Sequence, residues 1–325
     1  MPRLIALAAL ALTLAAPAAA QPTAIQAEIA RIAKPVEGIV GVAAWRLDRR
    51  GQRILVNADQ PFPMASTFKI AVAGAILAKV DRGELAPDQL VPVDPAMVVE
   101  SQGLAANFRH PGVSVSVKNL LELMMTVSDN TATDVLTKLA GGPSAVTAWV
   151  RVQGVQNLRV DRDTSGIIRD FFGIGPGPFP QALEAAYKAD PKLEERGSRL
   201  NPAFDNDPRD TATPLAMASL LERIFSGKAL KPASTQLLTE IMERNSTGKA
   251  RIPGRLPEGT VVAEKTGTIG GSLNDVGMIT LPGNAGKVIV AVFVKQSRKP
   301  FEDRERAIAD ISRALYDYYL FEPAR

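Results

Sequence analysis

Two residue types that do nucleophilic chemistry stand three positions apart near the start of an expected helix. They are Ser66 and Lys69 in the run Ser66-Thr67-Phe68-Lys69, and this spacing puts the hydroxyl and the amine on one helix face. A serine hydroxyl becomes a good nucleophile only when a base removes its proton, and a partly desolvated lysine can be that base. The pair therefore indicates a serine nucleophile with a lysine base. The motif alone is not specific, because the turn-like run Ser246-Thr247-Gly248-Lys249 repeats it.

A second motif, Ser128-Asp129-Asn130, lies at the expected junction of two helices. In such a turn Ser128 and Asn130 can face one way, while Asp129 points back and braces the turn. The alternative is that the motif only caps the helix that follows. The run Ser272-Leu273-Asn274 has the same Ser-x-Asn form, so this motif also depends on its context.

The third motif, Lys265-Thr266-Gly267-Thr268, follows a strand of small and β-branched residues. On a strand, Lys265 and Gly267 face one side, and Thr266 and Thr268 face the other. The absence of a side chain at Gly267 lets a ligand approach the backbone. Taken alone, the run also fits an exposed strand lysine with threonine neighbours.

The amino-acid composition excludes catalysis by cysteine and makes catalysis by histidine depend on a single residue. The chain has 325 residues, with 38 Lys and Arg against 34 Asp and Glu, one His and no Cys. The lack of Cys excludes disulfides, zinc–thiolate sites and a thiol nucleophile. The single histidine, His110, precedes Pro111-Gly112 and is expected on a surface loop, so we expect neither a histidine triad nor a metal or other cofactor. A scattered net charge of +4 is too weak to indicate nucleic acid binding.

The first twenty residues have the pattern of a signal peptide. Met1-Pro2-Arg3 precedes an apolar run over 4–14, and Pro17-Ala18-Ala19-Ala20 supplies the small residues that a signal peptidase accepts. The apolar run is shorter than the roughly 20 residues of a membrane span, which argues against an N-terminal anchor. We therefore expect an exported, periplasmic bacterial protein that is monomeric and has no membrane attachment after signal removal.

Strand and helix patterns divide the mature chain. Strand patterns stand towards both ends, and apolar residues at helical spacing fill most of the middle. Residues 154–213 are instead rich in Gly, Pro, Asp and Asn with weak periodicity, as in functional or mobile segments. Strands are expected at 39–45, 53–56, 260–263, 276–281 and 288–295, and helices at 21–35, 66–79, 117–127, 131–139, 143–152, 214–225, 232–244 and 301–320.

The strands at the two ends need partners, so the simplest arrangement is one antiparallel sheet built from both chain ends. The helical middle then forms an inserted domain, with a cleft between the two parts. The expected fold class is α+β, an α/β three-layer sandwich plus an inserted all-α domain. The expected division is a signal peptide over 1–20, a sheet domain over 21–63 and 245–325, and a helical domain over 64–244.

The ordered set Ser-x-x-Lys, Ser-Asp-Asn and Lys-Thr-Gly is the signature of penicillin-recognising serine enzymes. Most of the mature chain resembles the class A serine β-lactamases, including the segment 63–69 around Ser66 and the run Arg209-Asp210-Thr211-Ala212-Thr213-Pro214. The run from Asn245 to Ala263 resembles the A2 branch in particular. The resemblance implies the β-lactamase/DD-peptidase-like fold and hydrolysis of a small-molecule β-lactam, hence antibiotic resistance.

The resemblance also implies a role for each motif residue. Ser66 is the nucleophile that becomes acylated, Lys69 is a base, and Ser128 relays a proton to the departing lactam nitrogen. Asn130 holds the amide of the substrate side chain. The backbone N–H groups of Ser66 and Thr268 form the oxyanion hole. The substrate carboxylate is bound by Lys265, Thr266 and Thr268.

One part of the family pattern is missing. Class A enzymes carry Arg-x-Glu-x-x-Leu-Asn in the Ω-loop, where the Glu activates the water that hydrolyses the acyl-enzyme. Here Arg162 resembles the left edge of this pattern and Asn201 the right edge. Counting from these edges reaches Thr164 and Gly197, and neither is a carboxylate. An insertion separates the edges, so we expect an extended Ω-like loop over 162–213, closed by a pair between Arg162 and Asp210.

The substitute for the missing carboxylate is left open. The candidates are Asp163, Glu184, Glu194 and Glu195, and Glu195 is favoured because it stands shortly before Gly197 and Asn201. If none of them takes this place, acylation proceeds and hydrolysis is slow.

Two further departures concern substrate binding. The segment 100–104 lacks the aromatic residue that commonly lines the family's cleft. No Arg follows Lys265 closely to help hold a substrate carboxylate, and Arg251 and Arg255 are the two candidates that could reach the site instead.

Three functions follow from these residues. The first is a serine β-lactamase that works through a Ser66 acyl-enzyme. The second is a related serine hydrolase, a D-Ala-D-Ala peptidase or an esterase, and the third is a penicillin-binding sink or sensor that deacylates slowly. The Ω-like segment and the A2-like run favour the first, whereas the missing Glu keeps the third open.

Overall fold

The computed structural model describes residues 23–48, 51–108 and 110–322 of the chain. The expected signal peptide at 1–20 lies outside the described residues. None of the helices in the described ranges combines the length and the apolar character that crossing a bilayer requires.

Both ends of the described chain build one five-stranded antiparallel sheet, in the order β2-β1-β9-β8-β7. The central strands are β1 (Ile39–Arg46), β9 (Lys287–Lys295) and β8 (Ser272–Thr280). The edges are β2 (Ile54–Val56) and β7 (Val262–Ile269). The predicted α+β class, with an antiparallel sheet made from both chain ends, is confirmed.

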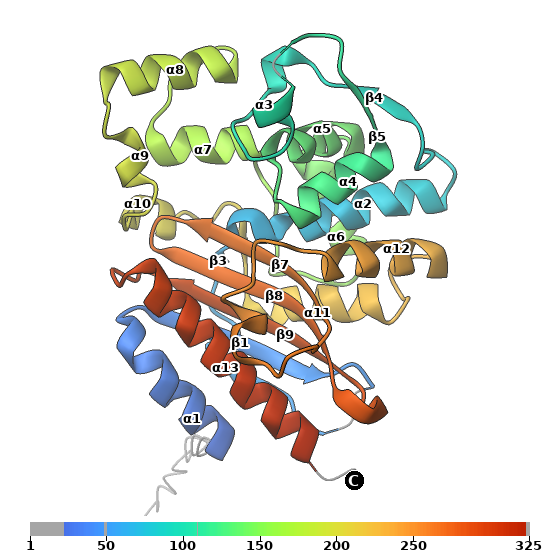
Figure 1. The fold of residues 1–325 in the computed structure, drawn as a ribbon, viewed down its shortest axis with the longest axis vertical. Helices are drawn as coiled ribbons and strands as arrows, with labels where there is room; N and C mark the ends of the chain where they lie inside the picture. Colours follow the sequence, from blue (N-terminus) through green and yellow to red (C-terminus); the bar gives the residue numbers. More distant parts are fainter. Residues whose placement is uncertain (1–22, 49–50, 109, 323–325) are drawn as a thin grey trace, which may run out of the picture.

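Both faces of this sheet are buried, which explains why its strands read as nearly continuous apolar runs. In β9, Ile289, Ala291 and Phe293 belong to the core shared with the helices of the middle of the chain. The alternate residues Val290 and Val292 belong to a second core on the opposite face. Helices α1 (Ala24–Ala33) and α13 (Phe301–Phe321) cover that second face, and α11 (Pro214–Phe225) packs on the first (Figure 1).

The helical layer is organised around α2 (Lys69–Asp81), whose first ten residues are all buried. It packs against α4 (Val117–Thr126), α5 (Asn130–Ala140), α6 (Pro143–Val152) and α12 (Pro232–Glu243). Because α11 and α12 come from the segment 64–244 and also contact the sheet, the predicted domain bounds stay a prediction. The smaller elements are η1 (Lys34–Val36), β3 (Phe62–Pro63), η2 (Ala65–Phe68), β4 (Leu90–Pro92), η3 (Pro95–Met97), α3 (Leu104–Asn107), β5 (Ser114–Ser116), β6 (Thr211–Ala212), η4 (Ile252–Arg255) and η5 (Pro282–Asn284).

The segment 154–213 has more regular structure than its composition predicts. It contains α7 (Thr164–Phe172), α8 (Phe179–Ala189), α9 (Leu193–Arg196) and α10 (Pro202–Asp205), which form one side of the helical layer (Figure 1). These helices are short, and side-chain caps and aromatic packing stabilise α7 and α10. Asp163 caps α7, and the ring of Phe171 packs edge-to-face against Phe172 and Phe204.

Candidate active site

Ser66 stands in the first turn of a helix whose entry is strained. It lies in η2, which continues directly into α2, and its side chain is partly exposed. The residue before it, Ala65, has φ 46°, a left-handed conformation that a residue with a Cβ adopts only when its surroundings impose it. The Met64 N–H donates to the carbonyl of Asp210 at 3.0 Å, and the Thr67 hydroxyl donates back to the Met64 carbonyl at 2.8 Å. The nucleophile segment is therefore held on both sides.

The buried amide of Asn274 in β8 ties this segment to the centre of the sheet. Its Nδ2 donates to the carbonyls of Pro63 at 2.8 Å and Met64 at 3.0 Å. Asn274 belongs to the second Ser-x-Asn run of the sequence, which predicted no role for it. Its partners are more than 200 residues away along the chain, so only the folded chain brings them together.

Lys69 is fully buried beneath the junction of α4 and α5. Its Nζ donates to the Ser128 carbonyl at 2.7 Å, to Ser128 Oγ at 3.1 Å and to Asn130 Oδ1 at 2.9 Å. Burial lowers the pKa of Lys69 to about 7, against the opposing effects of Asp134 and Asp129. Near neutral pH a substantial fraction of this amine is unprotonated, as a general base must be.

The Ser128-Asp129-Asn130 turn has the geometry that the sequence predicts. The Asp129 carboxylate is buried and accepts the N–H groups of Ala132 at 2.6 Å and Leu104 at 2.7 Å. Ser128 is left-handed at φ 58°, so the turn projects its hydroxyl towards Lys69 while Asp129 points back. The predicted bracing by Asp129 is confirmed, and its carboxylate also caps α5.

Lys265 approaches the same hydroxyl from the sheet side. It is fully buried in β7, and its Nζ donates to Ser128 Oγ at 3.0 Å and to the Thr266 carbonyl at 3.0 Å. The Ser128 hydroxyl therefore lies between two lysine amines that come from different layers of the fold. Burial, then the neighbouring Lys69 and Arg251, holds the pKa of Lys265 well below its usual range.

The threonines of the third motif face polar partners on the other side of β7. Thr266 Oγ1 lies 2.6 Å from Thr247 Oγ1, and Thr268 Oγ1 accepts from Arg251 Nη2 at 2.7 Å. Arg251 is buried and also donates to the Gly267 carbonyl, whereas Arg255 is half exposed beside Asp310. Of the two arginines that the sequence left open, Arg251 reaches the motif.

Gly267 lets β7 lie directly against the nucleophile segment. A Cβ built at this position stands 2.5 Å from the Met64 carbonyl oxygen and 3.2 Å from the Thr67 backbone nitrogen. Real Cβ atoms do not approach backbone so closely, so a side chain here separates β7 from η2. The sequence predicts that a ligand approaches the backbone at Gly267. In the structure, the Met64 carbonyl and Thr67 of the nucleophile segment lie against this backbone.

Two buried carboxyl groups, Glu264 and Asp275, lie behind Lys265. Both are almost wholly inaccessible, and burial, together with the neighbouring Asp275, raises the pKa of Glu264 well above its usual range. The Ile252 N–H donates to Asp275 Oδ2 at 3.0 Å, so Asp275 is the better-supported anion of the pair and Glu264 the carboxyl that keeps its proton. Sequence reasoning missed this pair, because strand alternation predicts which way a side chain points but not which carboxyl groups meet.

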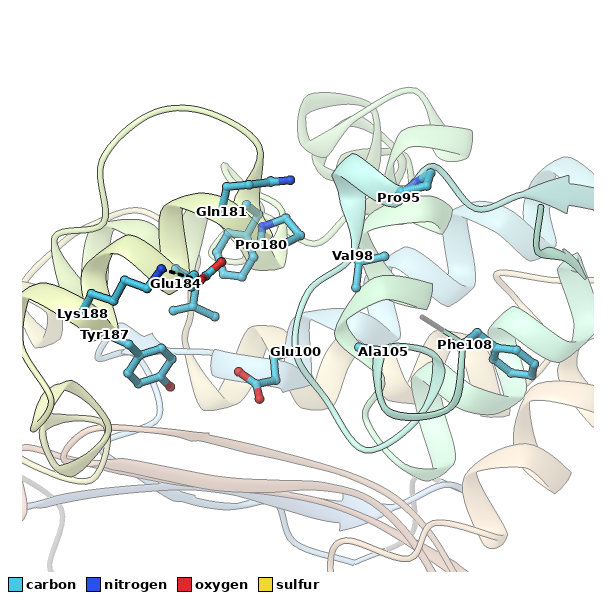
Figure 2. A pocket seen from close by; sticks show the side chains of 12 residues that line it. Pro95, Val98, Glu100, Ala105, Phe108, Pro180, Gln181, Glu184, Tyr187 and Lys188 are labelled. Carbon is cyan, nitrogen blue, oxygen red and sulfur yellow. Dashed lines mark ion pairs between the residues drawn. The ribbon is translucent and has the colours of Figure 1, made fainter. Parts of the chain in front are cut away.

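A cavity of about 690 Å³ adjoins the site between α8 and the segment 95–108 (Figure 2). Its lining includes Phe179, Leu183 and Tyr187 from α8, with Glu100 on the facing segment. The Glu100 carbonyl accepts from Asn130 Nδ2 at 3.2 Å, which connects this cavity to the catalytic turn. Burial and the nearby Glu100 raise the pKa of Tyr187. His110 lies on the exposed surface, as predicted.

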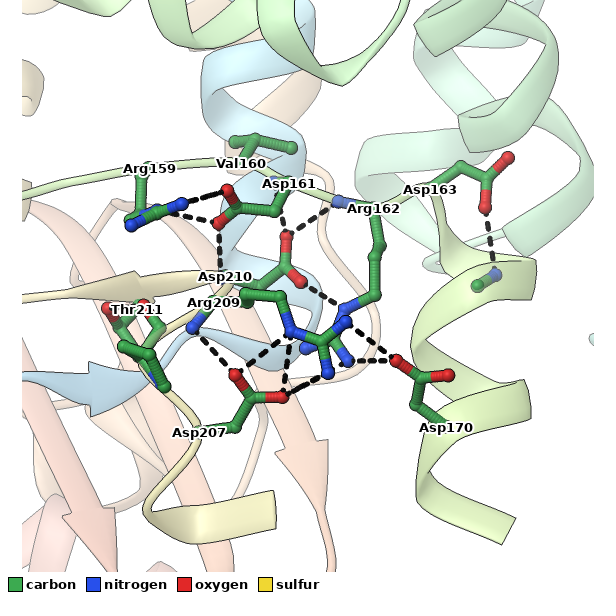
Figure 3. A network of polar contacts seen from close by, with 12 residues as sticks. Arg159, Val160, Asp161, Arg162, Asp163, Asp170, Asp207, Arg209, Asp210 and Thr211 are labelled. Atoms are coloured by element: carbon green, nitrogen blue, oxygen red, sulfur yellow. Dashed lines mark hydrogen bonds and ion pairs between the residues drawn. The ribbon is translucent and has the colours of Figure 1, made fainter. Parts of the chain in front are cut away.

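The base of the Ω-like segment is closed by a network of ion pairs (Figure 3). Arg162 Nε donates to Asp210 Oδ2 at 2.6 Å, as predicted, and Asp210 Oδ1 accepts the N–H groups of Asp161 at 2.7 Å and Arg162 at 3.0 Å. Asp210 is buried and left-handed at φ 52°, and burial raises its pKa despite these partners. Arg162 also contacts Asp170 at 2.6 Å and Asp207 at 3.3 Å.

The remaining predicted residues lie further along this segment. Asn201 caps α10, accepting from the Phe204 N–H at 3.3 Å, and donates to the Phe171 carbonyl. The Glu195 side chain is 54% exposed and forms an ion pair with Arg199 at 3.0 Å. No hydrogen bond or ion pair within the described residues joins Glu195 to the lysine cluster, and its catalytic role stays a prediction. Of the other candidates, Asp163 caps α7 and Glu184 forms an exposed ion pair with Lys188.

A serine on a strained helical turn, a buried lysine three residues further on and a hydroxyl that bridges two lysines are features of the class of serine enzymes that work through an acyl-enzyme. The comparisons with known proteins agree. A family model described as the beta-lactamase enzyme family matches residues 24–319, and the chain belongs to this family. The class A resemblance predicted from the motifs is confirmed.

Individual relatives cover nearly the whole chain. The extended-spectrum beta-lactamase PER-1 of Pseudomonas aeruginosa is 30% identical, with 93% of this chain and 89% of the relative aligned. Beta-lactamase CTX-M-25 of Escherichia coli is 31% identical over 93% and 92% of the two chains. The solved structure of an ancestral class A beta-lactamase superposes with a TM-score of 0.75 at 32% identity, covering 90% of this chain and 99% of that one.

Proposed function

We propose that this protein is a serine β-lactamase that opens the β-lactam amide through an acyl-enzyme on Ser66. The observation that carries the proposal is the Ser128 hydroxyl held between Lys69 and Lys265. In the first step the Ser66 oxygen attacks the lactam carbonyl carbon, and Lys69 accepts the hydroxyl proton. The ring C–N bond then breaks, and the lactam nitrogen takes a proton through Ser128.

Substrate recognition is proposed for the polar groups around this cluster. Asn130 holds the amide of the acyl side chain, and the carboxylate binds at Lys265, Thr266 and Thr268. The buried Arg251 adds positive charge behind Thr268, which supports an anionic group there. The N–H groups of Ser66 and Thr268 are the proposed oxyanion hole, because β7 packs directly against η2.

The N-terminal pattern supports export to the periplasm. The proposed enzyme is a monomer, and membership of the beta-lactamase family supports a small β-lactam as its substrate. The A2-like run and the long Ω-like segment favour a branch of class A with an enlarged loop. These remain proposals to be tested by signal-peptide processing in cells and by the mass of the purified protein in solution.

The test follows a chromogenic cephalosporin by absorbance and by intact protein mass. Many turnovers per enzyme, with a transient adduct on Ser66, support the β-lactamase. A stoichiometric burst with a lasting adduct supports the penicillin-binding sink or sensor instead. If the protein does not react at all, both proposals are wrong. Ser66→Ala is expected to abolish adduct and turnover, whereas Ser246→Ala, in the second Ser-x-x-Lys run, leaves both intact. An adduct that persists in Ser66→Ala overturns the nucleophile assignment.

A further inference from the structure

A buried carboxylate, Asp134, stands one helical turn beyond Asn130 on α5. Residues four apart share a helix face, so Asp134 lies on the face from which Asn130 Oδ1 accepts the Lys69 amine. Asp134 is only 2% exposed. Its two oxygens accept the N–H groups of Thr164 at 2.7 Å and Ser165 at 2.9 Å, at the first turn of α7. It therefore joins the lysine cluster to the point in the Ω-like segment where Thr164 stands in place of a carboxylate.

Two carboxylates and one amine carry charge near Lys69. Against the effect of burial, Asp134 of α5 and Asp129, the N-cap of α5, raise the pKa of Lys69, and the Lys265 amine of β7 lies on the other side of the Ser128 hydroxyl. The oxygens of both carboxylates accept backbone N–H groups, and Asp134 has the larger effect on Lys69.

Burial moves the pKa values of Asp134 and Lys69 in opposite directions. Burial, then Asp163 at the start of α7, raises the pKa of Asp134 to about 7, and Asp134 in turn raises that of Lys69. A proton that arrives on Lys69 therefore gains a buried counter-charge, and the lysine becomes a stronger base than burial alone allows.

We propose that Asp134 is a positioning residue that acts through Lys69, so that Lys69 is the base in hydrolysis of the acyl-enzyme as well as in its formation. The inference rests on the proposed function, because it needs an acyl group on Ser66. It removes the need for a carboxylate at position 164 or 197, since the negative charge is supplied from α5 instead of from the loop.

The hydrolytic step balances with these groups and water. The water oxygen forms a bond to the acyl carbonyl carbon, and one water proton moves to Lys69 Nζ, where the Asp134 carboxylate compensates the ammonium charge. The tetrahedral adduct collapses, breaking the carbon–oxygen bond to Ser66. The Ser66 oxygen recovers a proton from Lys69, which leaves a carboxylic acid product and free enzyme.

The experiment measures the acylation burst and the deacylation rate between pH 5 and 9. Asp134→Asn is compared with two matched variants, Asp163→Asn and Glu195→Gln. Asp163 caps the same helix α7, accepting the Gly166 N–H at 2.8 Å, so its variant weakens the helix start while the Asp134 carboxylate remains. Glu195→Gln tests the loop carboxylate that the sequence favoured.

In the unsubstituted protein we expect both rates to rise with pH through a shared midpoint near 7. Asp134→Asn is expected to slow deacylation by about 10²-fold and to move both midpoints lower by roughly one pH unit, because the lysine loses its counter-charge. Glu195→Gln is expected to keep the midpoint and the rate within a few-fold. Asp163→Asn is expected to keep the deacylation rate within a few-fold, although the loss of the Asp163 charge lowers the pKa of Asp134.

Two outcomes overturn the inference while the proposed function stands. One is a midpoint of the pH dependence of deacylation below pH 5 in the unsubstituted protein. This measurement does not depend on whether any variant folds. The other is a lasting adduct in Glu195→Gln together with an unshifted midpoint in Asp134→Asn. A Ser66 that is never acylated in the unsubstituted protein defeats the proposed function itself.

Discussion

Replacing Arg162 by methionine is expected to destabilise the protein strongly, because it leaves a buried charge behind. Methionine keeps much of the length of the side chain and removes its charge. The ion pair with Asp210 is enclosed, since the side chains of Arg162 and Asp210 are 10% and 3% exposed. Asp207 and Asp170 each keep a contact with Arg209, so the loss falls on Asp210.

The size of the stability loss in Arg162→Met depends on how well the Asp210 carboxylate is compensated once Arg162 is gone. Removing one partner of a buried pair costs about 3–5 kcal/mol, because the other charge stays buried without compensation. The two backbone N–H groups that also bond Asp210 favour the lower end of this range. Burial already raises the pKa of Asp210, so the carboxyl without Arg162 gains a proton as pH falls. The loss of stability in Arg162→Met should therefore be larger at pH 8 than at pH 5.

Urea unfolding followed by circular dichroism measures this loss at both pH values. The control is Arg159→Met, because the side chain of Arg159 is half exposed and its pair with Asp161 is expected to contribute under about 1 kcal/mol. Adding Asp210→Asn to Arg162→Met should recover much of the loss, since the amide oxygen still accepts both N–H groups and carries no charge. A loss in Arg162→Met no larger than in Arg159→Met would refute the reasoning.

Two further changes probe the strand β7. Gly267→Ala is expected to lower kcat/KM by about 10²-fold with little change in overall fold, because its Cβ meets the Met64 carbonyl and shifts the nucleophile segment; normal kinetics would show that the strand can yield. Glu264→Gln is expected to flatten the pH dependence of stability. The pKa of Glu264 is higher in the folded chain than in the unfolded chain. Its contribution to the free energy of unfolding is therefore present below the unfolded pKa and is lost as the pH rises through the folded pKa. Urea unfolding from pH 5 to 9 tests this, and Glu258→Gln on the surface is the control.

The motif residues and the outline of the fold could be predicted because each depends on neighbours in the sequence. Nearly continuous runs of apolar residues predicted the sheet strands β1, β8 and β9, and the spacing of Ser66 and Lys69 predicted that both lie at the start of one helix. The residues around the motifs could not be predicted in the same way. Asn274 meets Pro63 across 211 positions, and Arg251 meets Thr268 only because η4 packs beside β7.

The Ω-like segment shows a different limit. Its Gly- and Pro-rich composition predicts irregular chain, yet α7 forms, since a side-chain cap and packed aromatic rings can stabilise a helix too short to show a clear period. Asp134 was missed because a lone carboxylate in a helix pattern normally belongs on a solvated face. Its burial becomes visible only when α7 lies against α5.

The position of the Ser128 hydroxyl between two amines also determines the direction in which its O–H bond points. A hydroxyl oxygen has two lone pairs and one hydrogen. When Lys69 is protonated, it and Lys265 both donate to this oxygen, so both lone pairs are occupied and the hydrogen must take the remaining tetrahedral position. Ser128 is partly exposed, and that position is the one left for an acceptor outside the protein. The two buried lysines thus act as a rotational lock on a single O–H bond and orient its proton before any acceptor arrives.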